Sequence, residues 1–331
     1  MGKRLLATVL VLSVAAAVFS GCSGNKGDDK QIVLRLAETH PADYPTTKGD
    51  MEFARLVEER SNGRIKVEVY HSKQLGEEKA AIEQVQFGAI DLTRVSIAPL
   101  TEFVKELIAL QLPYVYRNGD HMWKVLEGPI GEDMLKKVEA GKFVGLCYYD
   151  PGSRSFYNSK KEVKSVDDLK GMKIRVMESK MMIDMINALG ASPTPMPYGE
   201  VYSAIQTGVI DGAENNWPSY DSSSHFEVAK YYTTDGHLRV PEILIMSKLV
   251  FDKLSSKDQK LIRQAAKDSV AVQKKLWADK EKESEAKVVA AGSKITRLDD
   301  AEIAKFQAKM EPLYKQYAEF ADLMEKIKNT K

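Results

Sequence analysis

The alternation of strands and helices in residues 31–98 constrains the fold of this chain more than any other feature of its sequence. Strand-like runs, in which apolar and polar side chains alternate, occur at residues 32–38, 64–70 and 89–96. Helical patterns separate them at residues 47–61 and 76–88, and a glycine follows or closes each one. A strand-helix-strand series usually places its strands in parallel. The sequence therefore predicts a parallel sheet with helices packed against it.

A second series of strands and helices follows in residues 142–248. Strands are expected at residues 142–149, 154–160, 172–177 and 240–248, and helices at residues 179–190 and 198–208. Further helical segments are expected at about 99–110 and 120–140, and in the C-terminal tail. The two series indicate an α/β protein with two similar halves, in which a ligand would lie at the carboxyl ends of the strands.

A long helical pattern runs from about residue 256 to about residue 291. At about 1.5 Å per residue this helix would exceed roughly 50 Å, so it either spans two domains or is kinked. A chain of 331 residues is long enough for two domains. We expect the first to comprise residues 31–151 with about 240–275. The second would comprise residues 152–239 with about 276–331, including the C-terminal helices.

The N-terminus has the layout of an export signal. Lys3 and Arg4 precede an apolar stretch from Leu5 to Phe19, which is shorter than the roughly 20 residues of a membrane span. We therefore expect residues 1–21 to be a signal peptide. The mature protein would lie outside the cytoplasm, in a periplasm or on the outer face of the cell membrane.

The small residues before Cys22 resemble a bacterial lipobox, although Phe19 stands where leucine is commoner. This predicts lipid attachment at Cys22, with residues 22–30 as a polar tether. The alternative is a plain signal peptide with an incidental cysteine. Acylation of Cys22 would leave Cys147 without a disulfide partner, and the apolar run around Cys147 predicts an inert buried thiol.

Motifs for catalysis and cofactor binding are lacking in this sequence. It has no G-x-S-x-G elbow, no G-x-G-x-x-G and no P-loop, and its five histidines show no metal-ligand spacing. A formal net charge of +1 without a long basic run argues against nucleic acid as a partner. We expect a protein that is not an enzyme and that holds no cofactor and no metal. An extracellular hydrolase remains the catalytic alternative, since acidic residues are abundant.

Three arginines lie in or beside apolar strands, where a charge is costly to bury without a partner. They are Arg94, Arg154 and Arg175. Each one taken alone is explained equally well by an internal carboxylate. Together, at strand ends that face one cleft, they predict a site for a small organic acid, because a guanidinium pairs with a carboxylate through two parallel hydrogen bonds.

Other candidates flank this cleft, and most have a structural alternative. Asn215 and Asn216 offer amides to hydroxyls or a carboxylate, and Trp217 suits the CH face of a sugar unless it is a core residue. Tyr198 either flanks the ligand or packs. The candidates in surface loops or at a helix start are His40, Tyr44 and Glu78, and Glu78 is equally explained by the helix dipole.

Several long motifs resemble the extracytoplasmic solute-binding proteins of tripartite ATP-independent periplasmic (TRAP) transporters, in their dicarboxylate-type branch. They are "QLGEEKAAIEQVQFGAIDL", "LKGMKIRV", "LGASPTPMPYGEVYSAIQTGVIDGAEN" and "FEVAKYY". The resemblance covers about residues 31–320. It implies a monomeric, two-domain protein of the periplasmic-binding-protein type that closes on its ligand like a hinged trap, with a long helix crossing both domains. It also implies membrane permease subunits as partners.

The resemblance also implies roles for individual residues. Arg175 matches the arginine that pairs with the substrate carboxylate, and Arg154 matches a second arginine near it. Asn215 matches an asparagine beside them, and Tyr198 matches an aromatic position that packs on the ligand.

The segments "HPADYP", "LTRVS" and "ENNWPSY" resemble the subgroup that binds hexuronates such as glucuronate and galacturonate. Trp217, Asn216, Arg94 and Glu178 would form a larger and more polar wall than a four-carbon diacid needs. Ser96 occupies a position where the sialic acid binders of the resembled family share an acidic residue. The presence of Ser96 argues against sialic acid as the ligand. C4-dicarboxylates or other sugar acids remain alternatives, as does a role as a ligand-sensing subunit.

Overall fold

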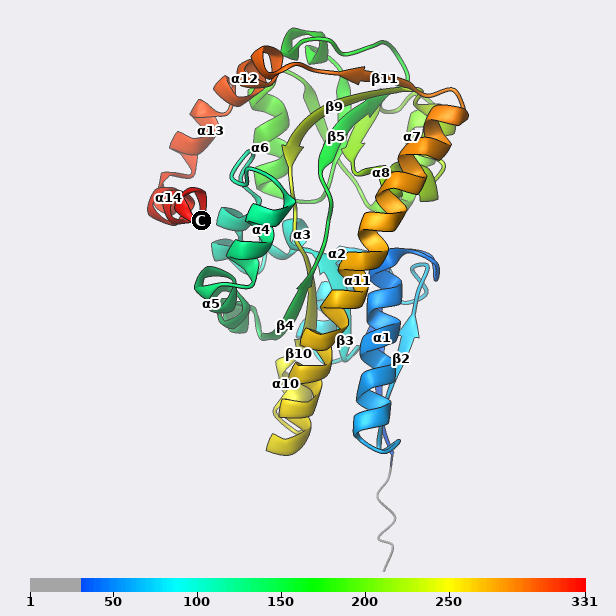
Figure 1. The fold of residues 1–331 in the computed structure, drawn as a ribbon, viewed down its shortest axis with the longest axis vertical. Helices are drawn as coiled ribbons and strands as arrows, with labels where there is room; N and C mark the ends of the chain where they lie inside the picture. Colours follow the sequence, from blue (N-terminus) through cyan, green and yellow to red (C-terminus); the bar gives the residue numbers. More distant parts are fainter. Residues whose placement is uncertain (1–30) are drawn as a thin grey trace, which may run out of the picture. The chain divides into compact units, whose positions relative to one another are not determined.

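The strands of this chain form two sheets, one of five and one of six strands, in a computed structural model that describes residues 31–331 (Figure 1). The predicted signal peptide, tether and lipid attachment at Cys22 lie outside the described residues. Residues 31–331 belong to one compact unit. The division of this part of the chain into two domains stays a prediction. The strands of the first sheet all lie within the residues predicted for the first domain, and those of the second sheet within the residues predicted for the second.

The first sheet contains the predicted parallel unit. Its strands, in the spatial order β2-β1-β3-β10-β4, are β2 (Ile65–Tyr70), β1 (Ile32–Ala37), β3 (Leu92–Ser96), β10 (Glu242–Ser247) and β4 (Phe143–Tyr149). β1 pairs in parallel with β2 and β3, which confirms the prediction for residues 31–98. β10 returns from far along the chain and pairs antiparallel with β3 and β4. It therefore brings Glu242 opposite Ser96.

The second sheet is mixed and was only partly predicted. Its strands, in the spatial order β11-β9-β5-β8-β6-β7, are β11 (Lys294–Arg297), β9 (Tyr231–Leu238), β5 (Arg154–Asn158), β8 (Gly212–Asn215), β6 (Lys173–Val176) and β7 (Ser192–Pro195). β6 is parallel to β7 and β8, whereas β5 is antiparallel to β8 and β9. The sequence analysis missed β7, β8, β9 and β11. Three of them have only four residues and no room for a visible alternation, whereas β9 has eight residues that do not alternate regularly.

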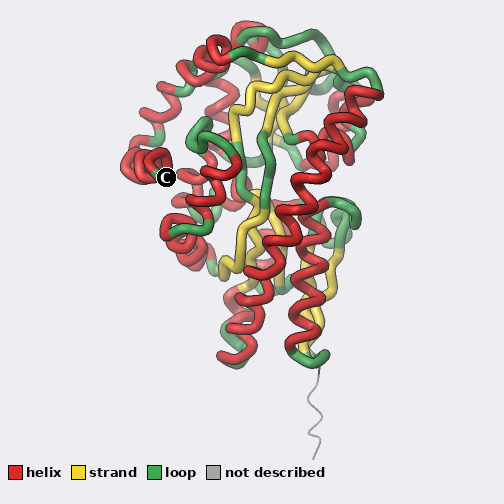
Figure 2. Tube along the Cα trace, viewed as in Figure 1, coloured by secondary structure: helices red, strands yellow, loops and turns green. Residues whose placement is uncertain are grey.

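Helices cover the faces of both sheets (Figure 2). Their bounds are α1 Pro45–Arg60, α2 Glu78–Gln86, α3 Ile97–Leu100, α4 Gly119–Leu126, α5 Pro129–Lys137, α6 Lys180–Ala188, α7 Val201–Gln206, α8 Trp217–Ser222, α9 His225–Val228, α10 Lys248–Phe251, α11 Ser256–Ala290, α12 Asp300–Ala308, α13 Glu311–Gln316 and α14 Ala321–Asn329. The helical segment expected at 120–140 is divided in two, because Pro129 cannot continue α4 and instead starts α5.

The predicted long helix is α11, of 35 residues, which begins after the N-cap Ser255. It runs beside both sheets (Figure 1). Near its start Asp268 pairs with Arg60 of α1 at 2.6 Å, and farther on Lys280 lies 3.3 Å from Asp221 of α8. The helix therefore ties the flank of the first sheet to the flank of the second.

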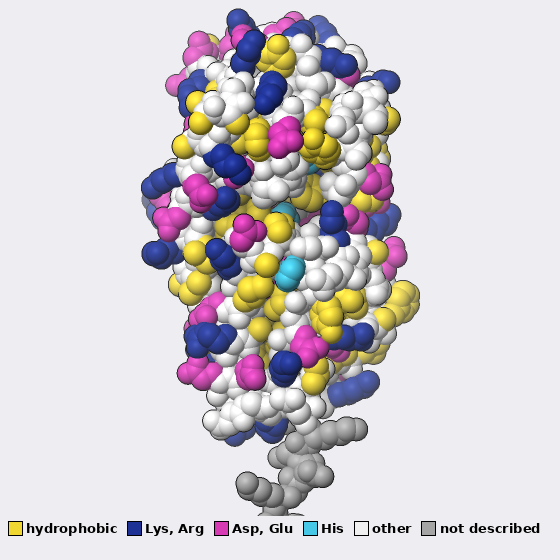
Figure 3. Space-filling view, turned by 90° about the vertical axis from the view of Figure 1, so that its right-hand side faces the viewer, with side chains coloured by type: hydrophobic (Ala, Val, Ile, Leu, Met, Phe, Trp, Pro, Cys, Tyr) yellow, Lys and Arg dark blue, Asp and Glu magenta, His cyan; other side chains and the backbone are white. Residues whose placement is uncertain are grey.

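Charged side chains of both signs are interspersed on the face drawn in Figure 3, as the near-zero net charge leads one to expect. Cys147 is buried in β4, as expected of an inert thiol, and burial raises its pKa. Within residues 31–331, no helix is both long and apolar enough to cross a membrane.

Candidate ligand-binding site

A cavity lies between the two sheets, at the ends of their strands. Its free volume is about 30 Å³, and about 410 Å³ when the gaps between atoms and the open solvent at its mouth are counted. Thr39 and His40 follow β1, Ser96 ends β3 and Met177 follows β6, so several carboxyl ends of strands meet here, as predicted. The lining residues are Thr39, His40, Tyr44, Thr46, Glu78, Ser96, Arg154, Arg175, Met177, Tyr198, Asn215, Asn216, Ser219, Glu242 and Trp277.

Arg175 lines the cavity as a buried cation without a carboxylate partner. Its side chain projects from β6, the residue is 3% exposed, and Nε and Nη2 both donate to the carbonyl oxygen of Met196, at 3.0 and 2.8 Å. Among residues 31–331, no carboxylate lies within ion-pair distance of this guanidinium. Burial is the largest influence on its pKa and lowers it. The charge of Arg175 is thus desolvated without being neutralised, which is costly unless an anion joins it.

Arg154 lines the same cavity but already has a carboxylate. Its Nε lies 2.5 Å from Glu214 Oε2 and its Nη2 lies 2.8 Å from Oε1, while Nη1 donates to Asn215 Oδ1 at 2.9 Å. Burial raises the pKa of Glu214, but Arg154 and His237 together outweigh burial and hold that pKa at about 2. Arg154 is therefore neutralised before any ligand arrives.

A histidine supports this ion pair from behind. His237 is buried, with Nδ1 2.7 Å from Asp235 Oδ2 and Nε2 3.5 Å from Glu214 Oε2. Burial lowers its pKa, but the two carboxylates outweigh burial and raise it to about 9. At neutral pH the cluster of Arg154, Glu214, Asp235 and His237 is consequently balanced, with two positive and two negative groups.

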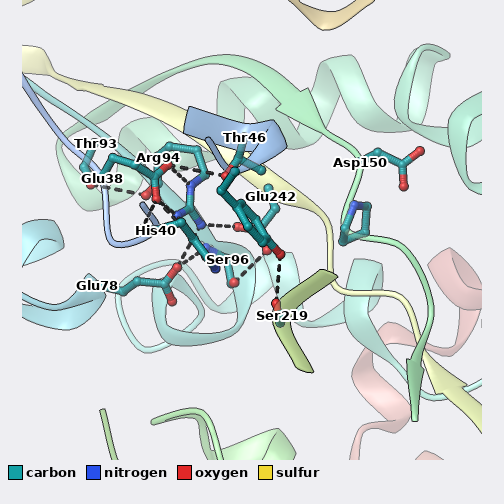
Figure 4. Close-up of polar contacts among 12 residues, drawn as sticks. Glu38, His40, Thr46, Glu78, Thr93, Arg94, Ser96, Asp150, Ser219 and Glu242 are labelled. Carbon is teal, nitrogen blue, oxygen red and sulfur yellow. Dashed lines mark hydrogen bonds and ion pairs between the residues drawn. The ribbon is translucent and has the colours of Figure 1, made fainter. Parts of the chain in front are cut away.

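Arg94 is fully buried beneath the cavity rather than lining it (Figure 4). It pairs with three carboxyl groups: Glu38, Glu78 at 3.0 Å and Glu242 at 2.6 Å. Burial raises the pKa of Glu38, but Arg94 and His40 together outweigh burial and the net shift is downward. Burial dominates at Glu78 and raises its pKa to about 7. The internal-carboxylate explanation thus accounts for Arg94 and Arg154, but not for Arg175.

Aromatic side chains form part of the cavity wall. The rings of His40 and Tyr44 stack at 4.0 Å between centroids, and Trp277 of α11 meets Tyr44 edge-on at 5.8 Å. The Arg175 guanidinium lies 5.7 Å from the ring centre of Tyr198. Tyr44 Oη lies 2.8 Å from Ser219 Oγ of α8, so this wall joins the flanks of the two sheets.

The structure brings most of the predicted site residues together. Those that line the cavity are His40, Tyr44, Glu78, Ser96, Arg154, Arg175, Tyr198, Asn215 and Asn216. Arg94, Trp217 and Glu178 do not line it. Trp217 stacks on Tyr232 at 3.7 Å within a hydrophobic cluster, in line with the core alternative, and Glu178 lies 3.8 Å from Lys79.

Sequence reasoning missed six lining residues: Thr39, Thr46, Met177, Ser219, Glu242 and Trp277. Glu242 had a usable signal, because a glutamate opens the apolar strand β10 just as Arg175 interrupts β6. Trp277 had none, because its place on a long helix does not tell which face meets the cavity. In the part of the chain that the structure describes, no group of His, Cys, Asp and Glu is arranged to hold a metal ion.

Comparisons with known proteins place this geometry among extracellular binding proteins. The family model described as "Bacterial extracellular solute-binding protein, family 7" matches residues 36–320. A solute-binding protein of Chromohalobacter salexigens is 41% identical over 280 residues, which are 85% of this chain and 83% of that protein.

Two solved structures are similar over most of both chains. A TRAP periplasmic solute-binding protein from Bradyrhizobium sp., in complex with D-galacturonate, has a TM-score of 0.88 at 47% identity, covering 90% of this chain and 99% of that one. Another from Pseudomonas putida F1, with bound D-glucuronate, has a TM-score of 0.87 at 40% identity, covering 90% and 97%.

Proposed function

This chain belongs to family 7 of the bacterial extracellular solute-binding proteins, which serve TRAP transporters, and from this premise we propose that its cavity binds a hexuronate, D-glucuronate or D-galacturonate, for delivery to a TRAP permease. The observation that carries the proposal is the guanidinium of Arg175, buried at the cavity without a carboxylate among residues 31–331. A carboxylate ligand supplies the missing negative charge.

Arg175, Arg154 and Asn215 form the carboxylate-binding end of the cavity in this proposal. The Oδ1 of Asn215 accepts from Arg154 Nη1 and from the backbone N–H of Asn216, both at 2.9 Å. Its Nδ2 is thereby left as a donor for a ligand oxygen. Arg154 is neutralised by Glu214 and contributes hydrogen bonds, while Arg175 contributes the charge.

The bound hexuronate links the two sheets. Tyr44, His40 and Trp277 approach from the flank of the first sheet and from α11, and Tyr198, Asn216 and Ser219 belong to the flank of the second. Closing the cavity without a ligand removes water from the Arg175 guanidinium without supplying a negative charge. The unliganded protein therefore favours the open state. A carboxylate neutralises the charge and makes closure favourable, because it contacts both walls only when they are together.

The same reasoning describes a binding component rather than a catalyst. We propose that the chain acts without chemical conversion of its ligand and hands it to a membrane permease. The neighbours with 40–47% identity have hexuronates in their binding sites, which supports this ligand class.

Attachment to the membrane through a lipid on Cys22 is part of the same proposal and rests on the sequence before that residue. The wild type should incorporate labelled fatty acid, whereas a Cys22→Ser variant should not. Absence of the label from the wild type would argue against the anchor.

The proposed function is tested by titration calorimetry of the chain without residues 1–22. D-glucuronate, D-galacturonate, succinate and sialic acid are compared at neutral pH. We expect one molecule of hexuronate to bind with micromolar or better affinity and succinate to bind far more weakly. Absence of heat with both hexuronates, or tighter binding of succinate, would contradict the assignment.

A further inference from the structure

The two walls of the cavity carry opposite charge. The wall from the second sheet presents Arg175, which has no carboxylate partner in the described residues, beside Arg154, which Glu214 neutralises. The wall from the first sheet holds one guanidinium, that of Arg94, against three carboxyl groups. The excess charge is therefore positive on one side of the ligand space and negative on the other.

Two of these three carboxyl groups reach the cavity. Glu78 and Glu242 line it, whereas Glu38 is fully buried behind Arg94. Glu242 Oε2 accepts from Arg94 Nη1 at 2.6 Å, and Oε1 accepts from Ser96 Oγ at 2.8 Å. Because a carboxylate offers about four lone-pair positions, both oxygens of Glu242 can still accept hydrogen bonds from a ligand.

Ser96 completes this side, which we call the acceptor pole: Glu78, Glu242 and Ser96. Ser96 gives its hydroxyl hydrogen to Glu242, so its oxygen is left to accept. His40 Nδ1 lies 2.6 Å from Arg94 Nη2, which only donates, and 3.1 Å from Glu38 Oε1, which only accepts, so these two contacts call for opposite tautomers of the ring. Burial, followed by the charge of Arg94, lowers the pKa of His40 and keeps the ring neutral.

We propose that the acceptor pole, and Glu242 above all, recognises the hydroxyl groups of the ligand and rejects a second carboxylate. The inference rests on the proposed function, because it takes the carboxylate of the same ligand to lie at Arg175. Sugar hydroxyls donate to the carboxylate oxygens of Glu242. A second ligand carboxylate has no proton to donate near neutral pH and is repelled by Glu242 at close range in a desolvated site.

The substrate class is consequently narrower than organic acids in general. It comprises polyhydroxylated acids with a single carboxylate, whereas aldaric acids and C4-dicarboxylates are excluded by charge rather than by size. The network that holds Glu242 in place also explains why Arg94 is buried: it fixes the glutamates without presenting its own charge to the ligand.

The test compares D-galacturonate with galactarate, which has the same carbon skeleton but a carboxylate in place of the aldehyde group and therefore cannot close into a sugar ring. The comparison with Glu242→Gln isolates the effect of charge from that of ring closure. In titration calorimetry we expect the wild-type protein to bind galacturonate at least about a hundredfold more tightly, since like charges facing each other cost several kcal/mol. The Glu242→Gln variant keeps the shape of the side chain but removes its charge. In this variant we expect the ratio of the galactarate Kd to the galacturonate Kd to fall by about tenfold or more. The matched control is Glu83→Gln, an exposed residue on α2 outside the cavity, whose ratio should equal that of the wild type.

The possible results separate this inference from the proposed function. Galactarate binding as tightly as galacturonate in the wild type overturns the acceptor pole, and so does an unchanged ratio in folded Glu242→Gln. Failure of every uronate to bind the wild type overturns the proposed function instead. Circular dichroism checks that each variant folds. If Glu242→Gln does not fold, the same measurements are made on Glu78→Gln.

Discussion

Arg175 donates two hydrogen bonds, from Nε and Nη2, to the single carbonyl oxygen of Met196. The contact fixes the orientation of the guanidinium, but a carbonyl dipole does not neutralise a full charge. Arg154 on β5, in contrast, meets both oxygens of Glu214. Of these two arginines that line one cavity, only Arg175 thus lacks a carboxylate partner, and this difference leads to the first prediction.

Replacing Arg175 with alanine should weaken hexuronate binding by at least about a hundredfold, because truncating one partner of a buried charge pair costs about 2–5 kcal/mol. The unliganded protein should keep its stability, because the open state that it favours leaves Arg175 hydrated. Calorimetry and urea unfolding measure the two effects. Arg55→Ala, at an arginine whose side chain is 57% exposed, is the control. Unchanged affinity in Arg175→Ala would refute the role given to this residue.

Glu214→Gln should destabilise the fold by about 3–5 kcal/mol, because it leaves Arg154 buried without its carboxylate. The surface variant Glu52→Gln, which breaks a solvent-exposed pair with Arg55, should cost no more than about 1 kcal/mol. Urea denaturation of both variants provides the comparison. Equal losses would mean that the buried cluster contributes no more than an exposed ion pair.

The charge on His237 should make stability depend on pH in the alkaline range. Its pKa is raised from 6.5 to about 9 in the folded protein, so its stabilising effect is complete below pH 6.5 and is lost as pH rises through about 9. The loss is on the order of 3 kcal/mol. Urea unfolding between pH 6 and 10, with His237→Gln as the comparison, measures it. A His237 imidazole resonance titrating near its unperturbed pKa would contradict this assignment.

Tryptophan fluorescence should identify which indole faces the ligand. Trp277 lines the cavity, whereas Trp217 stacks on Tyr232 in a hydrophobic cluster. A hexuronate should therefore change the emission of the wild type and of Trp217→Phe, but not that of Trp277→Phe. If the signal disappears only in Trp217→Phe, the sugar-facing role first assigned to Trp217 is the correct one.

Arg175, Arg154 and Arg94 carry the same local signal, a cation in an apolar strand, and only the family resemblance singled out Arg175. What separates them is the distance along the chain to their partners. Glu214 lies 60 residues from Arg154, and Glu242 lies 148 residues from Arg94. Such pairings arise only when β8 and β10 take their places in the sheets, so a single sequence does not show them.

The fold was predictable where elements are long and regular. The parallel unit of residues 31–98 and helix α11 have clear periods, whereas β7 and β8 are four residues each and depend on their neighbours in the sheet. The exchange of Trp217 for Trp277 has a similar cause. A tryptophan beside polar residues suggests a site, but the packing of α8 and α11 decides which indole faces the cavity.

The uncompensated guanidinium also limits how this protein can be improved. An engineer seeking heat resistance would place an acidic side chain within reach of Arg175, and the resulting molecule would be sturdier. The introduced carboxylate would pair with Arg175 permanently, and the protein would no longer bind an anionic ligand. The uncompensated charge of Arg175 therefore both lowers the stability of the empty, closed protein and enables it to capture an anion.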